Sequence, residues 1–283
     1  MPDISFVTTC KGRLEHLRQT LPRMAAQPDC ECIVVDYDCP DGTAAWVEEH
    51  FPAVKVVKVT HAPRFHKSHA QNLGAAAATA PWLCLIDADI LIDPAFRSVL
   101  LPLLKSGFYF RPRPLDWNAY GSFLCGRGDF ESVRGYDEAI EGCSCMDDDL
   151  YARLDMAGVK SAAFPGDQFV GIVHDDAMRT RYYEIRDRLL NQRINAMYAN
   201  IKHDLMRAST GKDITMVLRR SIYAEVKKAV LAADASGREC GEVELKLPAS
   251  SSVPLQHGWE IRRKWIFSLV RAHPPAAASG DGT

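Results

Sequence analysis

The chain lacks the features that place many proteins in a membrane, outside the cell or on nucleic acid. Its 283 residues contain no long uncharged run of the kind that a membrane-spanning helix needs. Residues 1–7 run straight into a strand-like pattern without the basic and apolar regions of a signal peptide, so we expect a cytoplasmic protein. A net charge of −2 gives no general attraction for nucleic acid, and any phosphate binding must come from local groups.

Two common nucleotide-binding signatures are also missing. The first predicted turn lacks the glycine-rich fingerprint of dinucleotide-binding folds, and the Walker lysine pattern occurs nowhere. Hydride transfer and P-loop hydrolysis are therefore disfavoured. The closest of the nine cysteines, Cys30/Cys32 and Cys143/Cys145, are spaced more tightly than the ligands of a zinc knuckle. We expect reduced thiols, with no structural zinc and no disulfide.

The composition that is present is typical of a soluble globular protein. Hydrophobic residues make up 47% of the chain and charged residues 25%, and no internal repeat is visible. The length is sufficient for one large α/β domain with a C-terminal extension.

An apolar segment with two carboxylates is the most informative stretch. Trp82–Leu91 predicts a strand buried on both faces of a parallel sheet, and Asp87 and Asp89 interrupt it. Buried carboxylates are costly without a partner. At the carboxyl end of a parallel strand, where α/β proteins bind ligands, a divalent cation that carries a phosphate group is a natural partner. The sequence therefore predicts a metal-nucleotide site.

Three further strands are predicted before this segment. Ile4–Thr9 ends in a turn with Gly12 and Arg13, which can present N–H groups and a guanidinium to an anion, although a solvated arginine would give the same pattern. Cys32–Asp38 closes on two aspartates. A carboxylate there commonly binds a ribose or base, and an Asx turn or helix cap explains it equally well. Val54–Val59 is the third strand.

A basic segment comes between the third strand and the acidic one. Arg64 and Lys67 lie where a diphosphate would need counter-charge, and a solvated basic loop is an equal alternative. The small residues of a helix predicted at Ala75–Ala80 allow close packing beside the acidic strand. A further helix is predicted at Ala95–Leu104.

Three consecutive aspartates, Asp147–Asp149, open a predicted helix. Carboxylates favour a helix N-terminus, which accounts for one or two of them. A third exceeds what capping needs, and mutual repulsion makes at least one a candidate for a raised pKa and proton transfer. His174 lies between an apolar segment and two aspartates, and it is a structural residue unless the fold brings it near Asp89.

The C-terminal part is predicted to be helical from Met178 to about Ile214 and from Lys212 to Ala233. Residues 257–271 form a basic, aromatic, amphipathic segment. It could rest on an anionic membrane surface as a peripheral contact, but packing against the main domain is favoured. We expect the small polar tail, residues 274–283, to be disordered.

Residues 3–195 carry five blocks whose order resembles the family 2-type glycosyltransferases of the GT-A fold. The resemblance is to the catalytic domain of β-1,4-galactosyltransferases and to bacterial polysaccharide polymerase domains. The blocks are Gly12–Leu17, Asp36–Asp38, Phe65–Gly74, Asp87–Asp89, and Gly135–Glu138 with Asp147–Leu154. The resemblance implies an α/β fold with a mixed, mostly parallel central sheet flanked by helices. We expect the catalytic domain at 1–195, a mainly helical extension at 196–273 and the tail at 274–283.

The resemblance also implies a role for each block. The implied donor-binding residues are Thr9, Arg13, Asp36, Asp38, Phe65, Lys67, Asn72 and Asp87. Asp89, the second aspartate of a DxD motif, and His174 are implied to ligate Mn²⁺ or Mg²⁺. Asp147 is the implied general base, and Asp148 is implied to orient the acceptor or the donor sugar.

The sequence departs from the family pattern at two places. Met146 stands where a glutamate usually precedes the catalytic aspartate, so acceptor positioning is expected to differ. His66 and Lys67 stand where asparagine and arginine are common, and lysine keeps the charge but loses the bidentate geometry.

The implied reaction is a metal-dependent inverting transfer from a nucleotide sugar, a UDP-hexose or UDP-N-acetylhexosamine, to a hydroxyl of a saccharide or glycolipid. A role in polysaccharide biosynthesis at the inner face of the membrane would fit it. Two alternatives remain. A sugar nucleotidyltransferase also uses aspartates and a divalent cation, but its first loop is usually rich in glycine and basic residues. A non-catalytic nucleotide-sugar binding protein would explain Met146 as the mark of a degenerate site.

Overall fold

The structure is a computed structural model, and it describes residues 1–209, 214–236, 240–247 and 263–270. Contacts divide the chain into two compact units, residues 1–195 and 196–283. The candidate functional residues of the sequence all lie in the first unit.

A seven-stranded sheet forms the centre of the first unit, in the order β3-β2-β1-β4-β7-β6-β8. Its strands are β1 (Ile4–Cys10), β2 (Cys30–Tyr37), β3 (Lys55–Val59), β4 (Trp82–Leu85), β6 (Phe108–Arg113), β7 (Phe123–Gly126) and β8 (Lys160–Pro165). The first four of these strands run parallel to one another, and β8 runs parallel to β6. β7 pairs antiparallel with both β4 and β6. The predicted mixed, mostly parallel sheet is confirmed.

The pairing register brings several chain segments to one edge of the sheet. Cys10 pairs with Asp36 and Val7 pairs with Leu85, so β1, β2 and β4 end close together. Leu85 also pairs with Phe123, so the segment before β7 reaches the same edge. Ligands of open α/β sheets bind outside the carboxyl ends of the strands. Residues that lie far apart in the sequence are therefore available to one site.

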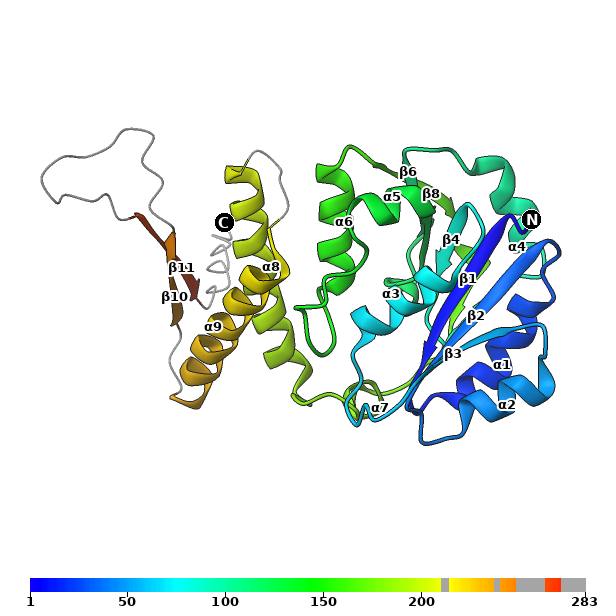
Figure 1. Cartoon of the computed structure of the whole chain (residues 1–283), viewed down its shortest axis with the longest axis horizontal. Coiled ribbons are helices and arrows are strands. Elements are labelled where there is room, and N and C mark those ends of the chain that lie inside the picture. The colour runs from blue at the N-terminus through cyan, green and yellow to red at the C-terminus, as the bar shows by residue number, and fades with distance from the viewer. Residues whose placement is uncertain (210–213, 237–239, 248–262, 271–283) are drawn as a thin grey trace, which may run out of the picture. The chain divides into compact units, whose positions relative to one another are not determined.

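Helices cover both faces of this sheet (Figure 1). The helices of the unit are α1 (Leu14–Ala25), α2 (Thr43–His50), α3 (Lys67–Ala77), α4 (Phe96–Leu100), α5 (Arg127–Ser132), α6 (Met146–Met156) and α7 (Asp176–Thr180), with 3₁₀ turns at Leu101–Leu103, Trp117–Ala119 and Gly166–Gln168. α1 and α2 pack on the face that carries Phe6 and Val34. α3 packs on the opposite face, where a Cβ on Gly74 would lie 2.3 Å from Val7 Cγ1. The close helix–sheet approach expected from small residues is confirmed.

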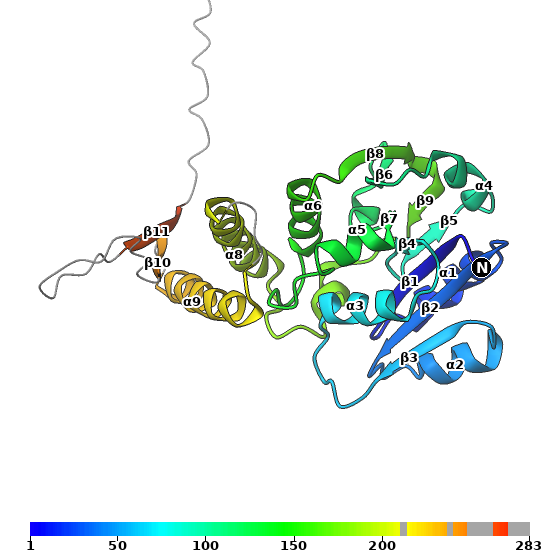
Figure 2. The same cartoon turned by 45° about the horizontal axis from the view of Figure 1, so that its top comes forward.

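The acidic segment is two strands, not the single strand that was predicted. β4 belongs to the main sheet, whereas β5 (Ile90–Ile92) pairs with β9 (Phe169–Gly171) in a separate two-stranded sheet (Figure 2). Between them the chain turns, and Ile90 N–H donates to the Asp87 carbonyl at 3.1 Å. In one continuous strand Asp87 and Asp89 would point to the same face. The turn allows the two carboxylates to reach different partners.

Two predicted helices differ in extent from those observed. The helix expected at Ala75–Ala80 is α3, which starts at Lys67 because the His66 side chain accepts the His69 N–H and caps it. The segment Ala95–Leu104 is the short α4 followed by a 3₁₀ turn. The helix that opens with three aspartates is confirmed as α6.

Helix α8 (Arg188–Ala208) spans the boundary between the units, and α9 (Met216–Ala235) lies in the second. The two predicted C-terminal helices are thus present, the first starting later than expected. β10 (Cys240–Leu247) and β11 (Arg263–Val270) form an antiparallel pair. Residues 263–270 of the amphipathic segment are therefore strand, and its other residues and the tail lie outside the described residues. None of the helices in the described ranges combines the length and apolar character needed to span a membrane.

Candidate active site

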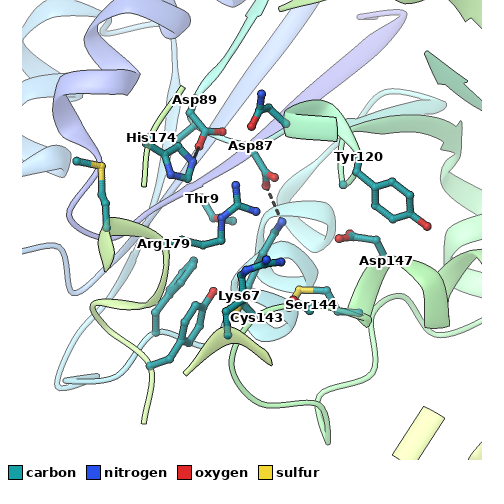
Figure 3. A pocket seen from close by; sticks show the side chains of 18 of the residues that line it. Thr9, Lys67, Asp87, Asp89, Tyr120, Cys143, Ser144, Asp147, His174 and Arg179 are labelled. Carbon is teal, nitrogen blue, oxygen red and sulfur yellow. Dashed lines mark ion pairs between the residues drawn. The ribbon is translucent and has the colours of Figure 1, made fainter. Parts of the chain in front are cut away.

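A pocket of about 640 Å³ opens at the edge of the sheet where β1 and β4 end (Figure 3). Its volume is in the range of sites for cofactor-sized ligands. Among the residues that line it are nine of the sequence predictions, namely Thr9, Arg13, Phe65, Lys67, Asp87, Asp89, Asp147, Asp148 and His174. The fold therefore brings residues from β1, α3, the β4–β5 turn, α6 and the segment after β9 into one cavity.

Asp87 and Lys67 form an ion pair across the pocket floor. Lys67 Nζ lies 2.7 Å from Asp87 Oδ1, and the Asp87 backbone N–H donates to Ser122 Oγ at 3.1 Å. Burial by itself lowers the pKa of Lys67, but the charges of Asp87 and Asp147 outweigh it and leave that pKa raised. Lys67 therefore stays positively charged, and Asp87 is held by the Lys67 side chain and by Ser122, the residue just before β7.

Asp89 points the other way and meets His174 and Arg13. His174 Nε2 lies 2.7 Å from Asp89 Oδ2, and Arg13 Nη1 lies 3.8 Å from the same oxygen. Burial favours a raised pKa for Asp89, yet the hydrogen bond from His174 and the charge of Arg13 lower it below its usual value. His174 thus lies close to Asp89, which is the condition under which it would be more than a structural residue.

Asp89 and His174 form a donor set that fits a divalent cation. His174 Nδ1 lies 3.1 Å from the Asp175 carbonyl, so Nδ1 can hold the ring proton when a cation takes the place of the Nε2 hydrogen bond to Asp89. Carboxylate oxygen and imidazole nitrogen suit Mn²⁺, while Mg²⁺ commonly takes one or two carboxylates together with phosphate oxygens and water. In the described ranges, no group of three or more His, Cys, Asp or Glu residues could hold a metal. The remaining ligands would have to come from a bound phosphate and water.

Asp147 faces these two pairs from the N-terminus of α6. The Tyr136 hydroxyl donates to Asp147 Oδ1 at 2.9 Å, and a Cβ on Gly121 would lie 2.8 Å from Asp147 Oδ2. Burial raises the pKa of Asp147, the Lys67 charge opposes this, and the Asp87 charge adds to it. A carboxylate with a raised pKa beside an open cavity is suited to accept a proton.

The three consecutive aspartates have three different environments, because successive residues of a helix point about 100° apart. Asp147 faces the pocket. Asp148 is exposed and accepts a hydrogen bond from the Tyr120 hydroxyl. Asp149 is fully buried, and Arg153 Nε donates to its Oδ2 at 2.9 Å. The third carboxylate thus belongs to the packing of the helix, while the first two reach the site.

The loop before α6 is held by the first turns of α8. Asn195 Nδ2 lies 3.0–3.1 Å from the carbonyl oxygens of Glu141, Cys143 and Ser144. The loop also packs tightly on α8 at Gly142, whose φ is +77° and whose Cβ, if present, would lie 2.1 Å from Asn191 Nδ2. These contacts fix the approach of α6 to the pocket. Sequence reasoning did not single out either asparagine, since neither lies in a recognisable motif.

An aromatic stack forms one wall of the pocket next to Asp148. Trp117 and Tyr120 are stacked, with ring centroids 5.7 Å apart and an interplanar angle of 10°. The Arg111 guanidinium lies 4.7 Å from the Tyr120 ring centroid and 4.3 Å from that of Tyr151. Trp117 is 76% exposed although it is supported from behind by this stack. An indole held rigidly at a pocket is a platform for an apolar face of a ligand.

Three predicted site residues are not among those that line the pocket. The Asp36 carboxylate accepts the Cys39 N–H at 2.7 Å and the Ala44 N–H at 2.6 Å, as in the Asx-turn alternative. Asp38 is exposed and accepts the Ala62 N–H at 3.0 Å. Asn72 Nδ2 donates to the Tyr136 carbonyl, and its Oδ1 accepts the Tyr136 N–H, at 3.0 and 2.8 Å.

The structure also adds cations that sequence reasoning did not assign to the site. Lys11 lines the pocket, but its Nζ donates to the carbonyls of Tyr37, Asp38 and Ala62 at 2.8–3.1 Å and so ties strand ends together. Arg179 of α7 also lines it. Its Nε has no hydrogen-bond partner in the described part of the chain, and it lies 3.9 Å from the nearest Asp176 oxygen. The Arg179 Nε–H is therefore available to an anionic ligand.

Comparisons with known proteins give a family match and a shared fold. Residues 5–110 match the family described as glycosyl transferase family 2. A comparison with curated protein sequences gave no significant match. Among solved structures, the mannosyltransferase PcManGT from Pyrobaculum calidifontis, in complex with GDP-Man and Mn²⁺, is 18% identical, with a TM-score of 0.53 over 83% of this chain and 77% of that one. TarS 1-349 from S. aureus in complex with UDP-GlcNAc is 12% identical, with a TM-score of 0.51 over 83% and 92%.

At such low identities the likeness to the solved structures establishes a shared fold. The family match covers β1 to β6, which includes the acidic turn after β4 and the turn after β1. Together the family match over residues 5–110 and the shared fold relate the N-terminal unit of this chain to the family 2-type glycosyltransferases with the GT-A fold.

Proposed function

We propose that this glycosyltransferase moves a sugar from a nucleoside diphosphate sugar to a hydroxyl group of a saccharide or glycolipid, with inversion at the anomeric carbon. The observation that carries the proposal is the placement of Asp147. It is a carboxylate with a raised pKa that faces, across one pocket, the ion pairs of Asp87 with Lys67 and of Asp89 with His174. A base and a charged binding wall on opposite sides are what a direct displacement at the anomeric carbon requires.

The wall formed by the β4–β5 turn and α3 is proposed to bind the donor. Lys67, Arg13 and Arg179 supply positive charge for a diphosphate. Asp89 and His174 would hold a Mn²⁺ or Mg²⁺ ion, which offsets the charge of the leaving diphosphate when bound. Thr9 and Phe65 line the same wall, and Phe65 is stacked on Tyr183 with centroids 5.8 Å apart. We assign these residues to the donor, and a UDP-sugar is the first donor to test.

For the predicted donor residues outside the pocket we propose indirect roles. Asp36 fixes the loop after β2 through two backbone N–H groups, and Asp38 fixes the segment before α3 at Ala62. Asn72 joins α3 to Tyr136, whose hydroxyl reaches Asp147. Each residue would then shape the site through backbone or side-chain positioning without touching the donor.

Asp147 is proposed to take the proton of the acceptor hydroxyl. The deprotonating oxygen attacks the anomeric carbon on the side opposite the diphosphate, and a single displacement inverts the configuration. The Tyr136 hydroxyl orients the Asp147 carboxylate. Asp148, which accepts a hydrogen bond from the Tyr120 hydroxyl, orients the acceptor. A positioned general base typically contributes between about 10² and 10⁴ to the rate.

The aromatic stack beside Asp148 supports the proposed acceptor class. Sugar rings present C–H groups on one face and hydroxyls at their edges, so they suit an exposed indole with nearby carboxylates. Trp117 offers such a face, and Tyr120 and Arg111 hold it in place. This favours a pyranose unit of a saccharide or glycolipid at the acceptor position.

The test begins with binding and ends with product identity. A thermal-shift panel of UDP-, GDP- and dTDP-sugars with and without Mn²⁺ should show one nucleotide class raising the melting temperature, more strongly with the cation, because a ligand of the native state stabilises it. Incubation of that donor with saccharide acceptors should release a nucleoside diphosphate and form a glycoside of inverted configuration. Release of pyrophosphate would instead indicate a nucleotidyltransferase, and binding without turnover on any acceptor would indicate a binding protein.

A further inference from the structure

Two cysteines meet behind the turn that carries Arg13. Cys10 is the last residue of β1 and is completely buried, whereas Cys39 follows β2 and is partly exposed. Their Sγ atoms lie 3.9 Å apart. Both thiols are free, and their strands are neighbours in the sheet.

The surroundings of Cys39 stabilise a thiolate. Its Sγ accepts the Gly12 backbone N–H at 3.1 Å and the Thr43 hydroxyl at 3.1 Å, in addition to the contact with Cys10. The hydrogen bond from Cys10 lowers the pKa of Cys39 to about 6, helped by Thr43 and Gly12 and opposed by burial. The same contact and burial raise the pKa of Cys10. These contacts favour the thiolate at Cys39 and the protonated thiol at Cys10.

Cys30 provides an internal comparison. It is also partly exposed and has Cys32 close by in the sequence, but burial raises the pKa of Cys30 to about 11 and that of Cys32 to about 12. Cys145 is partly exposed as well, and burial and the charge of Asp148 raise its pKa to about 12. All three cysteines are partly exposed, so the hydrogen bonds that Cys39 receives from the Cys10 thiol, the Thr43 hydroxyl and the Gly12 N–H make the difference.

We propose that Cys39 is a site of covalent modification by hydroperoxides and disulfides, with Cys10 as the thiol that resolves the adduct. With hydrogen peroxide, the Cys39 thiolate attacks one oxygen, the O–O bond breaks, and hydroxide leaves and takes up a proton, which gives a sulfenic acid and water. Cys10 Sγ then attacks Cys39 Sγ, and a second water leaves with the Cys10 proton. The sum is two thiols and one peroxide converted to one disulfide and two waters. With a disulfide, the Cys39 thiolate attacks one sulfur, the S–S bond breaks, and a mixed disulfide forms as the first thiol leaves. Cys10 Sγ then attacks Cys39 Sγ, and the second thiol leaves with the Cys10 proton.

Disulfide formation would remove the negative charge from the Cys39 sulfur that accepts the Gly12 N–H and so weaken this hydrogen bond. Gly12 has a φ of +69°, and a Cβ there would lie 2.2 Å from the Tyr182 ring, so the turn has little room to adjust. The next residue, Arg13, contacts Asp89 in the pocket. On the proposed function, we expect the oxidised protein to bind its donor less tightly than the reduced protein.

The chemical test uses the wild-type chain, so it does not depend on the folding of a variant. A pyridyl disulfide at pH 7 should react at Cys39 roughly fifty-fold faster than at Cys30, because the greater thiolate fraction outweighs the lower nucleophilicity of a low-pKa thiol. Peptide mapping should then find a Cys10–Cys39 disulfide, and equimolar hydrogen peroxide should give the same link. Equal labelling of Cys39, Cys30 and Cys145, or a link between other cysteines, would overturn the proposal.

Two variants separate the roles of the sulfurs. Cys10→Ser keeps a hydroxyl donor and should trap the mixed disulfide on Cys39, whereas Cys39→Ser should leave Cys10 unlabelled because Cys10 is buried. The control Cys30→Ser should behave like the wild type. Donor affinity of the oxidised protein, measured before and after dithiothreitol, is a separate readout. If Cys39 is modified as expected but no nucleotide sugar binds the reduced protein, the proposed function fails while the modification site stands.

Discussion

The wall around Asp89, which we propose as the donor wall, and the wall around Asp147, which we propose as the acceptor wall, hold aspartates in opposite ways. Asp89 lies against an imidazole and near a guanidinium, and its pKa is lowered by the His174 hydrogen bond and the Arg13 charge in spite of burial. Asp147 accepts a hydrogen bond from the neutral Tyr136 hydroxyl, and burial raises its pKa. Asp89 is thus kept as an anion on one wall, whereas Asp147 on the other wall is suited to take up a proton.

This difference separates binding from chemistry. A carboxylate that must hold a cation needs to stay charged, and paired cationic groups secure that. A general base works best when its pKa approaches the working pH, which burial favours. Lys67 connects the walls, because it pairs with Asp87 while its charge also limits the pKa rise at Asp147. Variants on the two walls should therefore fail in different ways.

The largest effect is expected at the acceptor wall. Asp147→Asn keeps the shape of the side chain but cannot accept the proton, so transfer should fall by about two orders of magnitude or more while donor affinity stays near wild type. Steady-state kinetics and donor titration on one protein preparation measure both. Asp167→Asn, at an exposed aspartate outside the pocket, is the control. Full activity of Asp147→Asn would contradict the proposal that Asp147 is the general base.

A smaller but broader loss is expected at the donor wall. Asp89→Ala should weaken Mn²⁺ binding by roughly ten- to a hundred-fold and abolish the benefit of the cation for nucleotide binding, because only His174 of the proposed pair remains. Mn²⁺ titration by electron paramagnetic resonance reads this without any turnover. EDTA should reproduce the effect in the wild type. Donor binding that is indifferent both to EDTA and to the substitution would contradict the metal site.

Tyr136→Phe tests why the Asp147 pKa has its value. The Tyr136 hydrogen bond lowers the Asp147 pKa and so opposes burial. The active form of the base is deprotonated, so activity is lost as pH falls through that pKa, and loss of the bond should move this acid limb to higher pH. At neutral pH we expect kcat to drop about tenfold, the loss of one hydrogen bond to a charged group. An unshifted limb with unchanged kcat would show that the phenol is only packing.

The smallest effect is expected at the aromatic stack. Trp117→Ala should raise the acceptor KM by several-fold and leave donor affinity unchanged, because a stacked aromatic contact contributes about 1 kcal/mol. Trp117→Phe should recover part of the loss by restoring a ring. Kinetics at varied acceptor concentration separate the two constants. A change in donor affinity instead of the acceptor KM would contradict the assignment of Trp117 to the acceptor.

Local sequence patterns were sufficient for much of the fold. Buried apolar runs indicated β1, β2 and β4, and the aspartates at the ends of β2 and β4 indicated the edge at which a polar ligand binds. The order of five short blocks indicated the family. The pattern was weaker where a turn interrupts an apolar run, as at Asp87–Asp89, because a strand and a strand–turn–strand unit contain the same residues there.

What the sequence determined alone is the set of groups available to the site, since strand ends, helix starts and residue types are local properties. Tertiary structure decided their use. Helix geometry turned Asp147 to the pocket and buried Asp149 against Arg153, and sheet register placed His174 beside Asp89. Asp36 was directed to backbone N–H groups, and Trp117 was supported by rings and a guanidinium from distant segments. These outcomes depend on contacts between residues far apart in the chain, and no local pattern encodes their distance or direction.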